Sequence, residues 1–394
     1  MSEVAQAPHS SPDGRIPQLR FPEFDGVWES RLLKDAVKIN PRSGELPDEF
    51  IYIDLESVKK GYLIKETQIN KIGAPSRAQR LLNKNDVIFQ TVRPYQKNNY
   101  FFNLDGDYVA STGYAQLRVL NSPEFLYQAL HTDRFVYDVM ARSTGTSYPA
   151  INSTDLSKIK LNLPTKPEQQ KIAAFLTAVD NKIEQLSTKQ VLLGEYKKGL
   201  MQQIFSQAIR FKADDGSDFP DWKENKVDEF MEVTRGQVLA VPEMRQVESE
   251  IFKYPVYSSQ TKNNGLTGYY TDYLFEDCIT WTTDGANAGD VNYRAGKFYC
   301  TNVCGVLRSK KGYANLCIAQ ILNSVSRRYV SYVGNPKLMN NVMEKIKISI
   351  PSSINEQTKI ANFLSSVDSK IEEVGKQLDE SKQFKKALLQ KMFV

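Results

Sequence analysis

Apolar residues alternate three and four positions apart in two long stretches of this chain, and polar residues fill the positions between them. Such spacing places the apolar side chains on one face of a helix and is typical of the contact line of a coiled coil. Each stretch predicts a helix of about 38 residues, about 57 Å long at 1.5 Å per residue. The positions expected to pair the helices are Ile172, Leu176, Val179, Ile183 and Leu186 in the first, and Ile360, Leu364, Val367, Ile371 and Val374 in the second.

The two helical stretches are copies of each other. Residues 168–206 align without a gap with residues 356–394, with 17 identities in 39 positions at a constant offset of 188. The similarity extends upstream to residues 158–164 and 345–351, which alternate apolar and polar residues and predict a strand. A looser match joins Phe21-Pro22 and Trp28 to Phe219-Pro220 and Trp222. The chain is therefore predicted to be a tandem duplication.

The start of each helix carries the pattern of a capping box, Thr165 with Glu168 and Ser353 with Glu356. Neither helix can bury its apolar stripe alone, and we expect the two copies to pair as an antiparallel coiled coil. The alternative is that each helix packs separately on its own globular unit. The pattern is interrupted at Gln190 and Lys197 in the first helix and at Ser381 and Lys385 in the second.

The globular units between the helices predict an α+β fold class. Short β-like runs occur at residues 86–91, 108–110 and 115–120 in the first unit and at 254–257, 278–282 and 304–308 in the second. A helix is expected after them, over 122–130 and 316–322. The predicted domains are a disordered tail (1–14), a first globular domain (15–164), a first helical region (165–208), a second globular domain (209–351) and a second helical region (352–394).

Composition excludes several classes of protein. No apolar run reaches the length of a membrane helix, and the Pro- and Ser-rich start lacks the pattern of a secretory signal. Without an export signal, the four cysteines, Cys278, Cys300, Cys304 and Cys317, predict free thiols in the cytoplasm. With only two histidines we expect no metal site. The net charge of +5 permits nucleic-acid binding without arguing for it.

Catalytic motifs are absent from the sequence. We find neither the Gly-rich cofactor turn and Asn/Asp-Pro-Pro-aromatic loop of an adenine methyltransferase nor a phosphate-binding G-x-x-x-x-G-K-[ST] loop. Asp221, Glu224 and Lys226 superficially fit a nuclease pattern, but the carboxylates are too close in sequence to come from adjacent strands. The sequence therefore predicts a binding protein with no catalytic residues.

Polar clusters in the diverged loops are the candidate DNA contacts. Arg and Lys can bond guanine edges or phosphates, Asn and Gln can bond adenine, and glycines let the backbone approach a duplex, although such residues also make ordinary solvated turns. The candidates in the first unit are Arg77, Arg80, Arg93, Tyr95, Lys97, Ser111, Thr112, Thr144 and Thr146. Those in the second are Ser258, Ser259, Gln260, Lys262, Asn263, Asn264, Thr283, Asn287 and Lys310.

Together these features resemble the specificity subunit of a type I restriction-modification system, over nearly the whole chain. The resemblance rests on the helix-entry signatures at residues 164–173 and 351–361 and on the domain-entry signature at 20–24 with its echo at 218–222. Residues 254–257, 265–269 and 284–289 also resemble a second-domain pattern of the family, with Ser258-Ser259 in place of its usual glycines.

The resemblance implies a subunit that supplies sequence recognition and no chemistry. Each recognition domain would read half of a bipartite site in double-stranded DNA, and the paired helices would set the unread spacer. Two modification subunits, which bind S-adenosylmethionine, would dock on the helices, and two restriction subunits would act with ATP and magnesium; this chain itself would hold no cofactor.

Two other hypotheses remain open at this level. One is a coiled-coil scaffold whose globular units bind proteins and never touch DNA. The other is the recognition half of a related system whose partner carries nuclease and methyltransferase activity on one chain.

Overall fold

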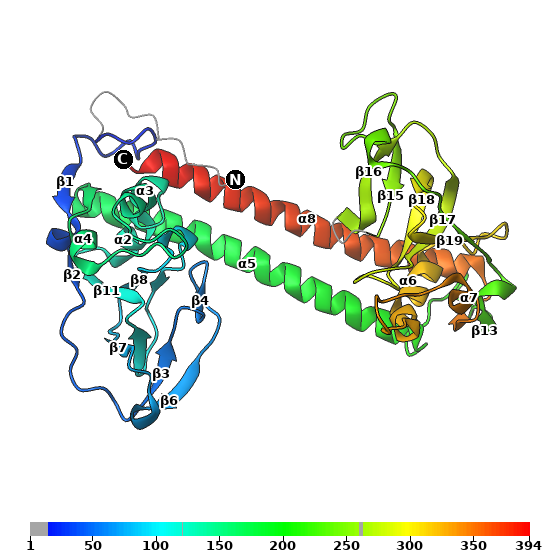
Figure 1. Ribbon diagram of the computed structural model, residues 1–394, viewed down its shortest axis with the longest axis horizontal. Helices are drawn as coiled ribbons and strands as arrows, with labels where there is room; N and C mark the ends of the chain where they lie inside the picture. The colour runs from blue at the N-terminus through cyan, green and yellow to red at the C-terminus, as the bar shows by residue number, and fades with distance from the viewer. Residues whose placement is uncertain (1–14, 120, 260–262) are drawn as a thin grey trace. The chain divides into compact units, whose positions relative to one another are not determined.

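The computed structural model describes residues 15–119, 121–259 and 263–394, and these form two compact units. Unit 1 comprises Met1–Lys189 and Val374–Val394, and unit 2 comprises Gln190–Glu373. The two long helices are α5 (Lys166–Phe205) and α8 (Ile354–Met392). Each unit therefore contains the start of one long helix and the end of the other (Figure 1). The predicted tail over residues 1–14 lies outside the described residues.

Unit 1 combines short strands with a layer of small helices over part of its sheets (Figure 1). Its further helices are α1 (Leu33–Ala36), α2 (Pro123–Ala129), α3 (Asp133–Ala141) and α4 (Ser153–Ser157), with 3₁₀ turns η1 (Lys71–Gly73) and η2 (Pro94–Gln96). Its strands are β1 (Glu29–Leu32), β2 (Val37–Ile39), β3 (Glu49–Ile53), β4 (Val58–Lys59), β5 (Tyr62–Leu63), β6 (Thr67–Asn70), β7 (Ala78–Leu81), β8 (Asp86–Gln90), β9 (Tyr100–Phe101), β10 (Tyr108–Ser111), β11 (Tyr114–Val119) and β12 (Lys160–Leu163).

Unit 2 is built around one six-stranded sheet. Its further helices are α6 (Leu316–Val325) and α7 (Asn340–Met343), with 3₁₀ turns η3 (Val227–Glu229), η4 (Val241–Glu243), η5 (Asn263–Gly265) and η6 (Ser326–Tyr329). Its strands are β13 (Lys223–Lys226), β14 (Glu232–Arg235), β15 (Tyr254–Tyr257), β16 (Leu266–Tyr270), β17 (Phe275–Thr282), β18 (Val291–Cys300), β19 (Cys304–Arg308) and β20 (Lys347–Ile350). The mixture of helices and sheets in both units confirms the predicted α+β character.

The two units share one strand order. In unit 2 the order is β14-β19-β17-β18-β15-β16. In unit 1 the same path is divided between two sheets, β2-β11-β8-β9 and β6-β3-β10-β7. The long strand β17 pairs with both β18 and β19, whereas in unit 1 its place is taken by β7, which pairs with β10, and by β8, which pairs with β11. The duplication seen in the helices therefore extends to the topology of the globular units.

A buried carboxylate ties the entry segment of unit 1 to the start of α5. Glu168 is fully buried, and its carboxylate accepts hydrogen bonds from Arg20 Nε (2.7 Å) and Nη2 (2.8 Å). The same carboxylate accepts a longer bond from Trp28 Nε1 (3.3 Å), and the chain passes from Trp28 directly into β1. Strand β1 pairs with β12, which leads back into α5. A bidentate, charge-assisted pair therefore closes this small loop of structure.

The same arrangement recurs in unit 2. Glu356, also fully buried, accepts from Arg210 Nη2 (3.2 Å) and from Trp222 Nε1 (3.1 Å), and Trp222 leads into β13, the partner of β20. The ring of Phe211 packs edge-on against Phe363 at 5.6 Å, as Phe21 packs against Phe175 at 5.8 Å. Arg210-Phe211 is thus the counterpart of Arg20-Phe21.

This arrangement corrects two sequence-based interpretations. The predicted match of Phe21-Pro22 to Phe219-Pro220 holds only in part, because Lys171 lies over Phe21 as Lys359 lies over Phe219, whereas the edge-on ring contact with the long helix is made by Phe21 and Phe211. The predicted role of Glu168 and Glu356 in capping boxes is also wrong. The carbonyls of Thr165 and Ser353 accept the first helical N–H bonds, but Glu168 and Glu356 bind Arg and Trp instead of turning back to the cap.

In unit 1 the end of α8 packs against the start of α5. Leu388 and Met392 share one buried cluster with Ile172 and Leu176, and Trp28 belongs to the same cluster. Lys385 Nζ lies 2.5 Å from Asp180 Oδ1 across the two helices. The end of α8 thus completes the apolar core at the base of α5.

In unit 2 the end of α5 packs in the same way against the start of α8. Ile204 shares the main buried cluster with Ile360 and Leu364. Lys197 Nζ lies 2.7 Å from Asp368 Oδ1. This ion pair repeats the one in unit 1 at the repeat offset of 188, because Lys197 matches Lys385 and Asp368 matches Asp180. The interruptions that the sequence showed at Lys197 and Lys385 are therefore positions at which a lysine reaches the other helix.

The residues expected to pair the helices lie mostly on buried faces. Val179 and Ile371 are half-buried, and the buried ones are Ile172, Leu176, Ile183, Leu186, Ile360, Leu364, Val367 and Val374. Within each unit, contacts between the helices are present near the helix ends.

We predict that Glu168→Ala lowers the free energy of unfolding by about 3 kcal/mol, because it leaves the Arg20 guanidinium and the Trp28 indole N–H without their buried acceptor. Chemical denaturation followed by tryptophan fluorescence measures this. The matched control is Asp105→Ala, which removes a carboxylate from an exposed pair with Lys84 and should change stability by about 0.5 kcal/mol or less. A loss for Glu168→Ala no larger than for the control would contradict the assignment.

Candidate nucleic-acid interface

Four loops of unit 1 that carry predicted DNA contacts meet at one place. The backbone N–H of Thr112 donates to the carbonyl of Arg77 (2.9 Å), and that of Arg93 donates to Pro149 (2.7 Å). Thr91 makes a further link between two loops, because its backbone N–H (3.0 Å) and its Oγ1 hydroxyl (2.7 Å) both donate to the carbonyl of Gly113. Residues distant in sequence therefore form one continuous loop surface.

This surface carries two exposed tyrosines, Tyr95 and Tyr148, and a half-buried arginine stacked on Tyr148. The Arg93 guanidinium lies 4.1 Å from the centre of the Tyr148 ring, and Tyr148 is 64% exposed. Arg93 and Lys97 both adopt left-handed backbone angles on either side of η2, which turns Tyr95 outward to solvent. The predicted contacts that are exposed here are Arg77, Tyr95, Thr144 and Thr146, with Arg93 and Thr112 half-buried.

The side chains of three other predicted contacts of unit 1 are bonded within the unit or at least partly buried. Lys97 Nζ bonds Asp133 Oδ1 (2.7 Å) and the His131 carbonyl (2.8 Å), which points it at the helical layer. Ser111 is buried, and its hydroxyl accepts the N–H of Gly113. Arg80 is half-buried on β7, and burial lowers the pKa of its guanidinium. We therefore take Ser111 out of the proposed interface.

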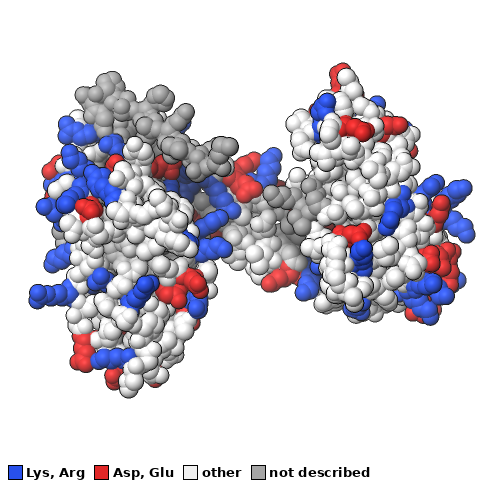
Figure 2. Space-filling model, viewed as in Figure 1, with Lys and Arg blue, Asp and Glu red and all other residues white. Residues whose placement is uncertain are grey.

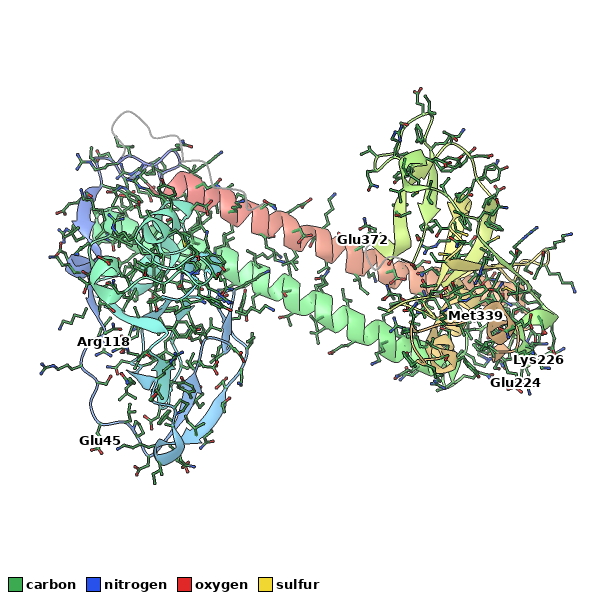
Figure 3. All side chains as sticks on the ribbon, viewed as in Figure 1. Glu45, Arg118, Glu224, Lys226, Met339 and Glu372 are labelled. Atoms are coloured by element: carbon green, nitrogen blue, oxygen red, sulfur yellow. The ribbon has the colours of Figure 1, made fainter. Side chains whose placement is uncertain are left out.

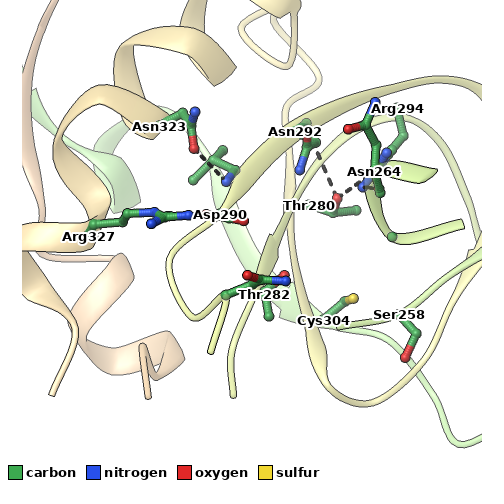
Figure 4. Close-up of a pocket in the computed structure, with 13 residues that line it drawn as sticks. Ser258, Asn264, Thr280, Thr282, Asp290, Asn292, Arg294, Cys304, Asn323 and Arg327 are labelled. Atoms are coloured by element: carbon green, nitrogen blue, oxygen red, sulfur yellow. Dashed lines mark hydrogen bonds and ion pairs between the residues drawn. The ribbon is translucent and has the colours of Figure 1, made fainter. Parts of the chain in front are cut away.

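Unit 2 has a polar pocket of about 230 Å³ where the loops after β15 and β17 meet the start of β18 (Figure 4). Of the predicted contacts, it brings together Ser258, Asn264 and Asn287. The other lining residues come from strands β17, β18 and β19, from the loop before β18, and from η5, α6 and η6. The sequence did not single out Asp290, Asn292, Asn323 or Arg327. The full lining is Ser258, Asn264, Gly265, Thr280, Thr282, Asn287, Asp290, Val291, Asn292, Arg294, Cys304, Asn323 and Arg327.

Arg294 is the most unusual member of this pocket. It is only 9% exposed, its Nε donates to Thr280 Oγ1 (3.1 Å), and its Nη2 donates to the Asn264 carbonyl (2.6 Å) (Figure 4). Its guanidinium also stacks on the Tyr257 ring at 3.8 Å. Loss of solvation lowers the pKa of Arg294. The sequence offered no signal for this residue, because it lies inside a strand.

The remaining predicted contacts of unit 2 are divided. Asn263 and Lys310 are exposed, Ser259 is half-buried, and Gln260 and Lys262 lie outside the described residues. Thr283 is fully buried, and its Oγ1 lies within hydrogen-bond distance of two acceptors, Asp284 Oδ2 (2.6 Å) and the Val303 carbonyl (2.9 Å). Burial removes Thr283 from the proposed interface, and the physical reason is that its hydroxyl holds two loops together.

Thr283 has a counterpart in Thr91 of unit 1, and the loops around both follow one hydrogen-bond pattern. Thr283 N–H donates to Val303 and Leu338 N–H donates to Thr283, as Thr91 N–H donates to Gly113 and Ile151 N–H donates to Thr91. In each unit a seven-residue loop, 144–150 or 331–337, is closed by a bridge between its ends. The second of these loops was missed from sequence. Its Tyr332 is 70% exposed, and the first loop also carries an exposed tyrosine, Tyr148, at a different position in the loop.

Charged groups on the surface are interspersed. On the face in Figure 2, Lys and Arg side chains of each unit lie among Asp and Glu side chains, in keeping with the small net charge of +5. Glu224 and Lys226, the superficial nuclease pattern, are exposed on β13 at the outer surface of unit 2 (Figure 3).

Metal-ligating and proton-transfer groups are poorly represented. Across residues 15–119, 121–259 and 263–394, no three His, Cys, Asp or Glu side chains are grouped as a metal would require. His131 Nδ1 lies 2.6 Å from the Tyr127 carbonyl, and burial lowers the pKa of its imidazole to about 4, so the ring is neutral at pH 7. Within the same ranges, no helix is both long and apolar enough to cross a membrane.

Comparison with known families decides between the open hypotheses. The family model described as the type I restriction modification DNA specificity domain matches this chain twice, over residues 26–193 and 220–380. The chain belongs to the type I restriction-modification DNA specificity family. Members of this family are DNA-recognition subunits, so the chain serves recognition rather than catalysis and is itself expected to hold no cofactor.

Individual relatives agree with this assignment. A type I specificity subunit of Mycoplasma pneumoniae is 31% identical over 219 residues, which cover 55% of this chain and 78% of that protein. The specificity subunit of the type I restriction enzyme MpnII from the same organism is 36% identical over 142 residues, covering 35% of this chain and 42% of the relative.

A solved structure supports the fold of the specificity family. The type I restriction-modification S subunit of M. genitalium has a TM-score of 0.65 to this chain, at 17% identity, and the match covers 96% of this chain and 99% of that one. At this identity the likeness concerns the fold alone.

We predict that Thr283→Val costs about 1 kcal/mol of stability, because it removes the hydroxyl that bonds the Val303 carbonyl inside the fold. Hydrogen exchange should speed up at residues 283–290 and 331–338, which Thr283 joins. Thr146→Val is the matched control at an exposed position and should change stability by about 0.5 kcal/mol or less. Unchanged exchange in both loops would contradict the role given to Thr283.

Proposed function

We propose that each unit reads one half of a bipartite site in double-stranded DNA and that the long helices hold the two readers at a set spacing. The observation that carries this proposal is the shared loop frame. Unit 1 and unit 2 repeat the same strand order and the same backbone bonds around Thr91 and Thr283, yet the side chains on the loops differ. A repeated frame with different side chains suits two different half-sites on a pseudo-twofold ligand such as a duplex.

The DNA-facing surface in this proposal is the set of loops described above. In unit 1 it comprises the loops around Arg77, Arg93, Thr112 and Tyr148, and in unit 2 the pocket rim with residues 331–337. Tyr148 and Tyr332 occupy matching loops and are both largely exposed. We expect them to make contacts common to both halves, while the neighbouring polar side chains read bases.

The pairing of α5 and α8 as one antiparallel coiled coil is part of the proposal. It is supported by the repeated ion pairs Lys385–Asp180 and Lys197–Asp368, by the mixed apolar clusters at the helix ends, and by the burial of the stripe residues. Such a pair is stiff and would fix the length of the unread spacer.

The third part of the proposal is that two modification subunits dock on the outer faces of these helices. Tyr196 on α5 and Phe384 on α8 are 57% and 54% exposed, and they match each other at the offset of 188. Large aromatic side chains kept exposed at the same place on both copies are typical of protein contacts. Two equivalent sites suit two copies of one partner.

We propose the remaining partners of this chain from those of its family. We expect the modification subunits to bind S-adenosylmethionine and two restriction subunits to use ATP and magnesium. The four cysteines of this chain are free and buried, which is consistent with action in the reducing cytoplasm. We propose the domain boundaries as residues 15–164 and 209–351 for recognition and 165–208 and 352–394 for the helices.

Mapping adenine methylation tests the proposed function. The chain, purified with its modification partner, should methylate a genomic DNA library at a bipartite motif with a fixed spacer, as read by single-molecule sequencing. A stable complex that methylates nothing would instead favour the protein-binding scaffold, and a continuous motif would contradict the two-reader arrangement.

Lengthening the helices tests the spacer. One heptad inserted after Lys189 and another after Gln377, the matching position, should extend each helix by about 10.5 Å, or about three base pairs at 3.4 Å per pair. The methylated motif should keep both half-sites and gain spacer. Insertion in only one helix, the control, should abolish methylation because the stripes and the ion pairs lose register. An unchanged spacer after the double insertion would refute the proposal that the paired helices set the spacer length.

A further inference from the structure

The polar pocket of unit 2 contains an unbalanced positive charge. Arg327 is neutralised, because its Nε lies 2.9 Å from Asp290 Oδ1. Arg294 instead bonds a threonine hydroxyl and a backbone carbonyl, and among the described residues no carboxylate pairs with it. The pocket lining therefore contains two arginines and one aspartate. Because the aspartate pairs with Arg327, the positive charge of Arg294 is left without a counterion in this lining, and the Arg294 side chain is nine-tenths buried.

A buried charge without a counterion is costly, and proteins usually pair it. Unit 1 shows the ordinary solution, since Arg118 on β11 makes two bonds to the buried carboxylate of Asp86, at 3.0 and 2.9 Å. Arg294 is held in place all the same, by the stack on Tyr257 and by its two hydrogen bonds. The fold thus fixes a guanidinium that no carboxylate of the described chain neutralises, and the anion of a ligand would supply the missing partner.

The rest of the pocket suits an oxyanion that projects from a larger ligand. Ser258, Thr282, Asn287 and Asn292 offer uncharged hydroxyl and amide groups around Arg294. A recessed site cannot reach base edges on the floor of a groove, whereas a backbone phosphate stands out from the duplex. Guanidinium binds phosphate through two parallel N–H donors, which is the strongest recognition this side chain makes.

Resting on the proposed function, we infer that this pocket seats one backbone phosphate of the half-site read by unit 2, with Arg294 as its anchor. The contact would place unit 2 on the duplex and would itself carry no base preference. The pocket lies between the loops that hold Asn264 and Asn287, so the seated phosphate would fix the position of both loops against the duplex.

The test is binding of the complete complex with its modification subunits to a duplex that carries the mapped motif. Arg294→Met should weaken binding by about tenfold to a hundredfold and reduce the slope of log affinity against log salt by about 1. The methylated motif should stay the same. Arg245→Met is the matched control, since Arg245 stacks on Phe252 in the same unit at 4.9 Å but does not line the pocket.

A methylphosphonate scan locates the phosphate. Neutralising one particular phosphate in the half-site of unit 2 should weaken the wild-type complex about as much as Arg294→Met does, and should have no further effect on that variant. Asp290→Asn removes the only acid of the pocket lining and keeps its shape, so it should tighten binding. It also provides a test if Arg294→Met does not fold.

Two results would overturn the inference. One is a folded Arg294→Met complex with unchanged affinity and salt slope; the other is an Asp290→Asn complex that binds no tighter. Failure of the proposed function is distinguishable, because the wild-type complex would then show no motif-dependent binding at all, which would overturn both proposals.

Discussion

One buried carboxylate at the beginning of each long helix organises this protein. Glu168 and Glu356 sit where a helix starts, and each receives an arginine and a tryptophan from the segment that enters its unit. The tryptophan leads into an edge strand that pairs with the strand before the helix. Because the carboxylate is desolvated, it must keep its partners, and so the entry segment, the strand pair and the helix form one rigid junction.

This junction lets the rest of each unit vary. Beyond it the strands follow the same order in both units, in two sheets in unit 1 and in one sheet in unit 2. Loops next to these strands are held by the threonine hydroxyls at positions 91 and 283. The loops between these fixed points have diverged, leaving Arg93 stacked on Tyr148 in unit 1 and, in unit 2, a buried Arg294 stacked on Tyr257 that pairs with no carboxylate of the described residues. The difference between the units is therefore chemical, while the frame that presents it is the same.

Sequence reasoning reached the parts of the structure that repeat or alternate. The helices, the strands before them and most strands of the sheets follow from periodicity, and the duplication follows from the offset of 188. It failed where the outcome depends on tertiary partners. Glu168 stands where a capping residue is expected, but its carboxylate binds Arg20. Thr283 is a polar residue in a predicted surface loop, but its side chain is buried and forms its hydrogen bond inside the fold. Arg294 lies within a strand, where the sequence pattern gives no sign of its role.

The central claim is that the two units share one backbone frame and that each unit reads its own DNA half-site independently of the other. Exchanging residues 15–163 for the recognition domain of another specificity subunit, with the helices and unit 2 kept, tests it most directly by mapping the methylated motif of the hybrid complex. The account predicts a new sequence in one half-site, with the other half-site and the spacer unchanged. A motif altered in both halves would contradict it.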